Sequence, residues 1–191
     1  MEPNLQPTDK KMFYKHLIKS SVYFEYGSGG STYKASIVKN IKKIYSVESD
    51  SEWHDLLKQK IQNNNVNFIY NDINTLPNTW GYPGKNATNI QKINYSNHIR
   101  NLTTEEQNAI DIVFIDGRFR VACCLKCYDI INDNCVIAFD DFLNRPHYHN
   151  IILNYFDIVE KTQDNVMVIL KKKSNVSIPK ELIEKYELIS E

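Results

Sequence analysis

The sequence contains no long hydrophobic run and no excess of charge of either sign. No apolar stretch approaches the ~20 residues that a membrane-spanning helix needs, and the opening MEPNLQPTDKK lacks the apolar core of a secretory signal. Lys plus Arg number 23, as do Asp plus Glu, so the formal net charge is zero. A nucleic-acid binder normally needs a positive surplus to displace counterions. We therefore expect no membrane partner and disfavour nucleic acid, although a net figure does not exclude a local basic patch.

Cysteine is also scarce. The chain has four cysteines, Cys123, Cys124, Cys127 and Cys135, and three of them lie within five positions. This spacing fits one face of a helix better than a disulfide framework. No second cysteine pair supplies the remaining ligands of a zinc site. We expect these cysteines to be core residues, and the chain to be cytoplasmic, in a reducing compartment.

What the sequence does have is an alternation of short apolar runs and amphipathic stretches over 191 residues, a length typical of one domain. The predicted strands are 22–25, 44–47, 66–70, 110–115 and 135–139, and the predicted helices are 31–40, 52–62, 121–131 and 148–156. Residues 156–160 and 165–171 are predicted to form a closing antiparallel pair that contributes one antiparallel edge strand. The pattern indicates an α/β fold, a Rossmann-like doubly wound sheet that is mostly parallel with helices on both faces.

One polar stretch, residues 74–108, interrupts this alternation. A connection this long inside one domain is typical of a functional or a disordered segment. Trp80, Tyr82 and Tyr95 favour a packed segment that faces a ligand, and a surface insertion is the alternative. We predict that residues 74–108 close over a substrate.

A glycine-rich turn follows the first predicted strand, in the segment Glu25-Tyr26-Gly27-Ser28-Gly29-Gly30-Ser31-Thr32. Glycines at such a turn permit positive φ and a close approach of the backbone to a ligand. The start of the following helix favours anionic or polar groups. Thr32 stands where a dinucleotide fingerprint has its third glycine, which weighs against nicotinamide or flavin binding. A plain strand–helix turn is the alternative.

Two acidic residues end the next two predicted strands. Glu48 follows Gly29 by nineteen residues, and a carboxylate there can accept hydrogen bonds from ribose hydroxyls. Asp72 follows the third strand and either contacts an adenine amino group or caps a helix.

These residues resemble the class I S-adenosylmethionine-dependent methyltransferases over about residues 22–171. The acidic-x-Gly-x-Gly pattern at Glu25, Gly27 and Gly29 looks like their first motif, and Glu48 looks like their acidic residue after the second strand. The resemblance implies a seven-stranded sheet with the last strand antiparallel, and S-adenosylmethionine as cofactor. The residues assigned to the cofactor on this basis are Glu25, Gly27, Ser28, Gly29, Ser31, Thr32, Glu48, Asp72, Ile73 and Asp116.

A second acidic cluster follows the fourth and fifth strands, with Asp116 in Phe-Ile-Asp-Gly and Asp140 and Asp141 in Ala-Phe-Asp-Asp. Three carboxylates at one edge of a parallel sheet repel one another unless they share a positive charge, and Mg²⁺ with oxygen ligands fits that need. The arrangement is similar to sugar O-methyltransferases of the macrocin O-methyltransferase type, and catechol-type enzymes also place acids at these strand ends. The alternative is that the aspartates cap the following helix and pair with Arg118, Arg120 or Arg145.

The remaining candidates concern the acceptor. Arg118 and Arg120 follow the fourth strand, where a guanidinium can hold a phosphate or carboxylate, or else pair with the aspartates. Trp80 is assigned to the substrate. Asp116 and His147 are the candidates to remove a proton from a substrate hydroxyl, and an inert surface histidine is the alternative for His147.

The sequence therefore predicts an S-adenosylmethionine-dependent methyltransferase that O-methylates a hydroxyl of a sugar or sugar nucleotide. The acceptor is a small molecule or glycan, and a homo-oligomer is left open. The alternatives are a non-catalytic binding module or partner subunit that keeps the cofactor fold, a nucleotide-binding oxidoreductase, and a methyltransferase acting on another small molecule or on RNA. The single domain spans 1–191 and carries residues 74–108 as a substrate-side insertion.

Overall fold

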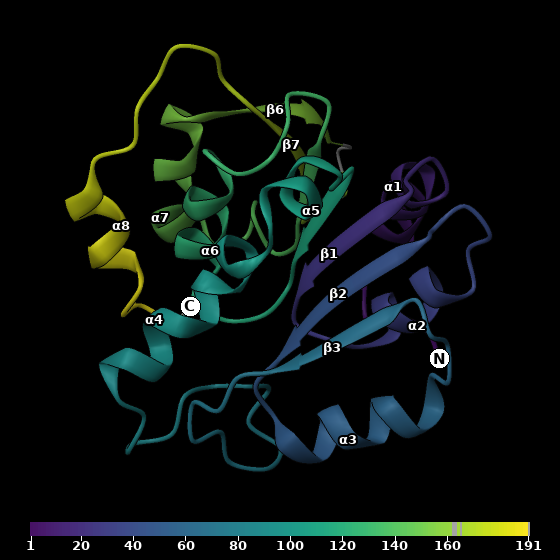
Figure 1. The fold of residues 1–191 in the computed structure, drawn as a ribbon. Helices are drawn as coiled ribbons and strands as arrows, with labels where there is room; N and C mark the ends of the chain where they lie inside the picture. The colour runs from purple at the N-terminus through teal and green to yellow at the C-terminus, as the bar shows by residue number, and fades with distance from the viewer. Residues whose placement is uncertain (162–163, 165, 191) are drawn as a thin grey trace.

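A computed structural model describes residues 1–161, 164 and 166–190 (Figure 1). Its centre is one seven-stranded sheet with the order β3-β2-β1-β4-β5-β7-β6. The strands are β1 (Val22–Tyr26), β2 (Lys43–Glu48), β3 (Val66–Tyr70), β4 (Ile112–Ile115), β5 (Val136–Phe139), β6 (Phe156–Glu160) and β7 (Val168–Lys172). β1 to β5 pair in parallel, and β7 is antiparallel to both β5 and β6. The predicted Rossmann-like sheet with an antiparallel last strand is confirmed.

The place of the antiparallel strand differs from the prediction. β7 lies between β5 and β6, so β6 and not β7 forms the edge of the sheet. The chain returns from β6 and pairs along β5, which gives β7 a hydrogen-bonded neighbour on both sides. The predicted start of this strand at residue 165 lies outside the described residues.

Helices cover both faces of the sheet. α1 (Pro7–Leu17) and α2 (Gly30–Ser36) pack on one face, and α3 (Ser51–Lys60) packs against β2 and β3. The other face carries α4 (Asn89–Asn97), α6 (Arg120–Cys127) and α8 (Lys180–Tyr186), which lie to the left of the sheet in Figure 1. The remaining helical elements are η1 (His98–Asn101), α5 (Thr104–Asn108), α7 (Pro146–His149) and η2 (Asn150–Asn154).

Two hydrophobic cores lie on opposite faces of the strands, because successive side chains of a strand point to opposite sides. Tyr23 and Phe114 pack with α1 and α2, whereas Phe24 and Val113 pack with α6. The four cysteines are free and buried, which confirms the prediction that they are core residues. Within the described ranges, no helix is long and apolar enough to cross a bilayer.

The segment 74–108 is not one uniform insertion. It contains α4, η1 and α5, and it forms the crossover that carries the chain from β3, at one edge of the sheet, past β2 and β1 to the parallel strand β4. Thr88 and Gln91 form a capping box that starts α4, and Thr103 and Glu106 form another that starts α5. Tyr95 and Ile99 are buried in the core beside α6. Only the part before α4 is a loop.

A buried ion pair ties this crossover to the C-terminal helix. The ammonium of Lys126, on α6, pairs with Glu187 just after α8 and donates to Ser96 Oγ at 2.8 Å and Asn97 Oδ1 at 2.6 Å. Its side chain is fully buried. The pair therefore couples α4, α6 and the end of α8.

Candidate functional site

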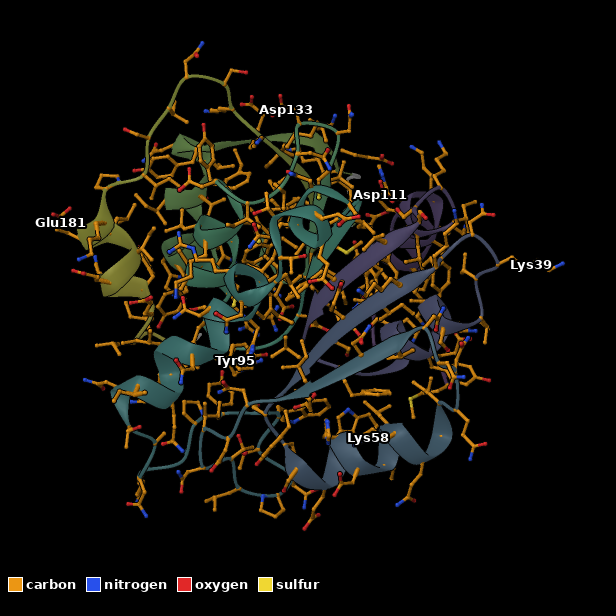
Figure 2. All side chains as sticks on the ribbon, viewed as in Figure 1. Lys39, Lys58, Tyr95, Asp111, Asp133 and Glu181 are labelled. Atoms are coloured by element: carbon orange, nitrogen blue, oxygen red, sulfur yellow. The ribbon has the colours of Figure 1, made fainter. Side chains whose placement is uncertain are left out.

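A cleft of about 880 Å³ opens where β1, β2, β4 and β5 end. Figure 2 shows Tyr95, which lines the cleft, and Asp111, which precedes β4, at opposite ends of the sheet. The lining residues are 1–4, the loop 27–31, Glu48, Ser49, Asp50, Trp53, Asn78, 80–82, Tyr95, 116–118, Arg120, Asp140, Asp141 and Arg145. In an open parallel sheet, ligands bind at the carboxyl ends of the strands, where this cleft lies.

The loop after β1 is shaped by its glycines. Gly27 has φ of +94°, and a Cβ atom there would lie 2.7 Å from the backbone nitrogen of Gly117. The loops after β1 and β4 therefore approach each other more closely than a side chain allows. At Gly29 a Cβ would meet nothing within 4 Å, so this residue leaves the cleft open. Gly30 is covered by the backbone of Glu2 and Pro3, which forms a wall of the cleft.

Glu25 supports this loop from behind. Its fully buried carboxylate accepts hydrogen bonds from Tyr23 at 2.6 Å, Ser31 at 2.7 Å and Ser46 at 2.7 Å, and from the Thr32 hydroxyl. Burial raises the pKa of Glu25, and these donors oppose the rise. Neither Glu25 nor Thr32 belongs to the cleft lining, whereas Gly27, Ser28, Gly29 and Ser31 do. The first acidic residue of the motif thus holds the loop and does not face the cleft.

Glu48 ends β2 and lines the cleft directly. Its carboxylate accepts backbone N–H bonds from Ser28 at 3.1 Å, Ser49 at 2.7 Å and Asp50 at 2.8 Å. A carboxylate has about four acceptor positions, so these three donors leave one for a further hydroxyl. Burial raises the pKa of Glu48 to about 7, even though the backbone donors lower it.

Asp72 and Ile73, both predicted to bind the cofactor, do not line the cleft. Asp72 is exposed, and its carboxylate accepts from the backbone N–H of Asn74 at 2.7 Å and from Gln91 at 3.4 Å. Asn74 has φ of +54°, so Asp72 stabilises a tight turn rather than a helix start. Ile73 is buried in the core. The turn directs Asp72 away from the site.

A loop from the segment after β3 forms another wall of the cleft, with residues 78 and 80–82. The hydrogen bond from Gly84 N to Ile73 O, 3.0 Å long, closes the base of this loop. At its tip, the Tyr82 ring lies under the Arg118 guanidinium, 4.4 Å from centroid to carbon, and Gly81 O accepts from Ser49 Oγ at 3.4 Å. Trp80 is 80% exposed at the rim. The structure thus brings Trp80 and Arg118, both predicted substrate residues, to one wall.

The acidic cluster is built around an arginine. The Arg120 guanidinium lies 3.1 Å from Asp116 and 3.4 Å from Asp141, and it donates to the backbone oxygens of Gly117 and Asp140 at 3.0 and 2.8 Å. Arg145 also pairs with Asp141, at 2.7 Å. Arg120 lines the cleft but is only 2% exposed, and its guanidinium is engaged by these aspartates and backbone oxygens.

The predicted Mg²⁺ site is not supported by this arrangement. The positive charge that Asp116, Asp140 and Asp141 need comes from Arg120, which stands among them. Nowhere in the described part of the chain do three or more His, Cys, Asp or Glu side chains form a group that fits a metal ion. The alternative pairing with Arg120 and Arg145 is the arrangement observed.

Asp140 is the most deeply placed carboxyl group of the cluster. It is 7% exposed, and its Oδ1 atom is buried with no hydrogen-bond partner among the described residues. Burial and the charges of Asp116 and Asp141 raise its pKa to about 8, against the effect of Arg120. Burial also raises the pKa of Asp116, and Arg120 opposes that rise.

His147 does not lie in the site. It is exposed on α7, with its ring 4.3 Å from that of Tyr148, and it is not among the cleft-lining residues. His149 is buried two positions further on, and burial lowers its pKa to about 4. The helical turn that starts at Pro146 directs His147 outward, so a role for it as proton acceptor is not supported.

Sequence reasoning missed several residues of the cleft, above all Trp53. This tryptophan lies in the first turn of α3, is 38% exposed, and donates from Nε1 to the backbone oxygen of Ser28 at 2.9 Å. The sequence predicts only that Trp53 lies in the helix 52–62. The signal that could have identified Trp53 is its position. It follows Asp50, the N-cap residue of α3, by three residues, and Asp50 comes two residues after Glu48.

Comparison of the sequence with protein-family models and with curated proteins gives no match. Among solved structures, the chain is similar to a methyltransferase-like protein from Silicibacter pomeroyi, with 23% identity, coverage of 98% of this chain and 97% of that chain, and a TM-score of 0.85. An RNA methyltransferase from Salinibacter ruber in complex with S-adenosyl-L-homocysteine has 12% identity, 93% and 97% coverage, and a TM-score of 0.53. A precorrin-6y C5,15-methyltransferase from Geobacter metallireducens has 13% identity, 91% and 94% coverage, and a TM-score of 0.51.

These similarities extend over 91% to 98% of this chain. The protein therefore has the Rossmann-like fold of methyltransferases.

Proposed function

We propose that this protein binds S-adenosylmethionine in the cleft and transfers its methyl group. The observation that carries the proposal is the pairing of the Gly27 turn with a buried Glu48 that keeps one acceptor position, on a seven-stranded sheet whose fold is similar to that of solved methyltransferases. The fit to the cofactor is specific. Glu48 would accept hydrogen bonds from the ribose hydroxyls, and the backbone of the glycine loop would lie against the methionine portion. Trp53 offers an aromatic face beside Glu48 and the glycine loop.

When bound, the cofactor supplies a methyl group that its sulfonium makes electrophilic. The task left to the chain is to align an acceptor behind that methyl and to exclude water from the cleft. Alignment of this kind can reach effective molarities of about 10⁵ M or more. Residues 1–4, the loop after β3 and the turns after β4 and β5 enclose the place where an acceptor would lie.

The acceptor we propose is a hydroxyl of a sugar or sugar nucleotide. Two features support it. Asp116 and Asp140 offer carboxyl oxygens to hydroxyl donors at the ends of β4 and β5, and Trp80 with Tyr82 presents exposed aromatic faces on which a sugar ring can pack. The loop that carries these two aromatic residues belongs to the segment we predict to close over the substrate.

Calorimetry with S-adenosylhomocysteine tests the first part of the proposal. Saturable one-site binding is expected, and its absence would exclude methyl transfer from this cofactor. A NAD titration is the matched comparison for the oxidoreductase alternative, and no heat is expected.

Methyl transfer is then measured with methyl-labelled S-adenosylmethionine and a panel of sugars, sugar nucleotides, other small hydroxyl compounds and total tRNA. Labelling of the sugar classes supports the proposed acceptor. Labelling of tRNA alone would replace it with RNA, and cofactor binding without any transfer would favour the non-catalytic module.

A further inference from the structure

One wall of the cleft carries two aromatic rings and a cation. The Tyr82 ring lies under the guanidinium of Arg118, 4.4 Å from ring centroid to guanidinium carbon, and Trp80 precedes Tyr82 by two residues. All three residues line the cleft. Their exposure falls from 80% at Trp80 through 43% at Tyr82 to 6% at Arg118. The wall therefore runs from an open aromatic rim to a nearly buried cation.

The backbone at the rim is held in a costly conformation. The φ angles of Asn78, Trp80 and Gly81 are +62°, +55° and +75°. Residues other than glycine rarely adopt this left-handed region, and those that do cluster at sites that hold ligands. The indole of Trp80 is exposed, so its own burial does not offset the cost. A large ring held in this way at the mouth of a cleft indicates a surface on which a ligand packs.

Arg118 places a positive charge beside these rings. A guanidinium that stacks by its face keeps its N–H donors at its edge, where they match the oxygens of a phosphate or carboxylate. Burial lowers the pKa of Arg118, and the charge of Arg120 lowers it further, against the effect of Asp116. Arginine nevertheless stays protonated in proteins. An anion brought to Arg118 would offset both unfavourable effects.

The aspartates beside Arg118 have cations of their own. Arg120 lies 3.1 Å from Asp116 and 3.4 Å from Asp141, and Arg145 lies 2.7 Å from Asp141. Their negative charge is thus compensated within the fold. Asp116 still has 34% of its side chain exposed and lines the cleft two residues before Arg118. A hydroxyl donor can therefore bind next to an anion held by Arg118.

We propose that this wall binds a nucleoside diphosphate sugar: the nucleobase stacks on Trp80, a phosphate lies at the edge of Arg118, and the sugar extends toward Asp116. This inference rests on the proposed function and narrows its acceptor from sugars in general to sugar nucleotides. A phosphate or a carboxylate alone would satisfy Arg118. The aromatic rim favours a ligand that carries a planar ring as well as the anion, because bases stack on aromatic side chains.

A stretch of RNA also presents bases and phosphates. Binding of a polyanion needs several cations along its path, whereas the chain has a formal net charge of zero. A nucleoside diphosphate needs only one ring and one strong cation, which the wall supplies. The observations therefore favour the small ligand over RNA.

Calorimetry with UDP on protein saturated with S-adenosylhomocysteine tests the assignment. Saturation fills the places of the cofactor's own adenine and carboxylate, so UDP cannot take them. UDP should bind saturably. It should bind more tightly than uridine, which lacks the phosphates, and more tightly than glucose 1-phosphate, which lacks the base.

Two variants separate the phosphate from the base. In Arg118→Gln the Kd for UDP should rise about 10- to 150-fold, the effect of one charge-assisted hydrogen bond, while the Kd for uridine stays within about twofold. Trp80→Ala should raise the Kd for UDP and for uridine by the same factor, about 5- to 150-fold. Both variants should bind S-adenosylhomocysteine as the wild type does. Lys85→Gln is the matched control: it removes an exposed cation of the same segment outside the cleft lining and should leave the Kd for UDP unchanged.

Binding of S-adenosylhomocysteine without binding of UDP would overturn this inference and leave the proposed function standing. UDP affinity that is unchanged in both variants would overturn it as well. Variants that lose affinity for S-adenosylhomocysteine and not for UDP would assign the wall to the cofactor instead. A short oligouridylate that displaces UDP at a lower nucleotide concentration would make RNA the ligand.

Failure of the wild type to bind S-adenosylhomocysteine would refute the proposed function and, with it, this inference. Thermal melts check that the variants fold. If Arg118→Gln does not fold, Trp80→Ala decides, because its side chain is 80% exposed and can be removed without disturbing the core.

Discussion

Replacement of Glu48 by Gln should weaken cofactor binding strongly without unfolding the protein. The carboxylate already accepts three backbone N–H bonds, and the side chain lines the cleft. A glutamine keeps the size of the side chain but turns one oxygen into an N–H₂ group. That group cannot accept from Ser28 N or from a ribose hydroxyl. The cofactor thus loses a charge-assisted hydrogen bond.

The expected size of the effect follows from that single bond. A hydrogen bond to a charged group is worth about 1.5–3 kcal/mol, which corresponds to about a 10- to 150-fold rise in Kd for S-adenosylhomocysteine. The ionisation of Glu48 adds a pH dependence, because its pKa is raised to about 7. Between pH 6 and pH 8 the ionised fraction rises from about one tenth to about nine tenths. Wild-type affinity should therefore increase roughly tenfold over this range.

Calorimetry with S-adenosylhomocysteine at pH 6, 7 and 8 measures both effects. The Glu48→Gln profile should be flat relative to the wild type. Asp50→Asn is the matched control, since Asp50 also lines the cleft but uses its side chain to cap α3 at Trp53 N, 3.0 Å away. A Glu48→Gln variant that folds and binds within about twofold of the wild type would refute the assignment of Glu48 to the ribose.

Three further predictions test the fold and the corrected assignments. Gly27→Ala should lower the free energy of unfolding by about 2 kcal/mol or more, because Gly27 has a positive φ and lies against the backbone of the turn after β4. Gly29→Ala should leave the free energy of unfolding in urea unchanged and should weaken S-adenosylhomocysteine binding, because a Cβ at Gly29 meets no protein atom. Lys126→Met should cost about 3–5 kcal/mol in urea unfolding by stranding the buried carboxylate of Glu187, and adding Glu187→Leu should recover most of it; no recovery would contradict the pairing. Asp72→Ala should keep the Kd for S-adenosylhomocysteine within about twofold, because Asp72 lies outside the cleft, and a larger loss would return Asp72 to the site.

The central strands were predictable because each is a short apolar run with an unambiguous period. The segment before Asp116 is the clearest case, since β4 is buried at every position and its run reads as a strand without reference to the rest of the chain. α1 and α5 have no comparable signal. α5 buries no side chain, and α1 is polar on average with four buried positions. The place of β7 between β5 and β6 depends on strand pairing, which no local pattern encodes.

The meeting of the glycine turn and Glu48 in the cleft was predictable for a related reason. A glycine turn that follows a strand, and an acid that ends the next parallel strand, meet at the same edge of the sheet by geometry alone, as Gly27 and Glu48 do. Asp72 satisfies the same rule and yet does not line the cleft, because its carboxylate accepts a hydrogen bond from the backbone N–H of Asn74, where the chain makes a left-handed turn. The end of a strand determines where the backbone leaves the sheet. The conformation of the next two or three residues determines whether a side chain there points into the cleft.

Arg118 and Arg120 show where sequence reasoning reaches its limit. They lie two positions apart after the same strand, and nothing in their local sequence separates their roles. Phe119 between them has φ of +53°, so the chain turns there and α6 begins. Arg118 lies over Tyr82, a residue 36 positions earlier in the chain, whereas Arg120 enters the aspartate cluster. A cation supplied by the chain cannot be removed by a chelator or exchanged for another ion. The carboxyl groups of Asp116 and Asp140 are therefore held together by the fold itself, and any proton transfer at this edge should be independent of divalent metal.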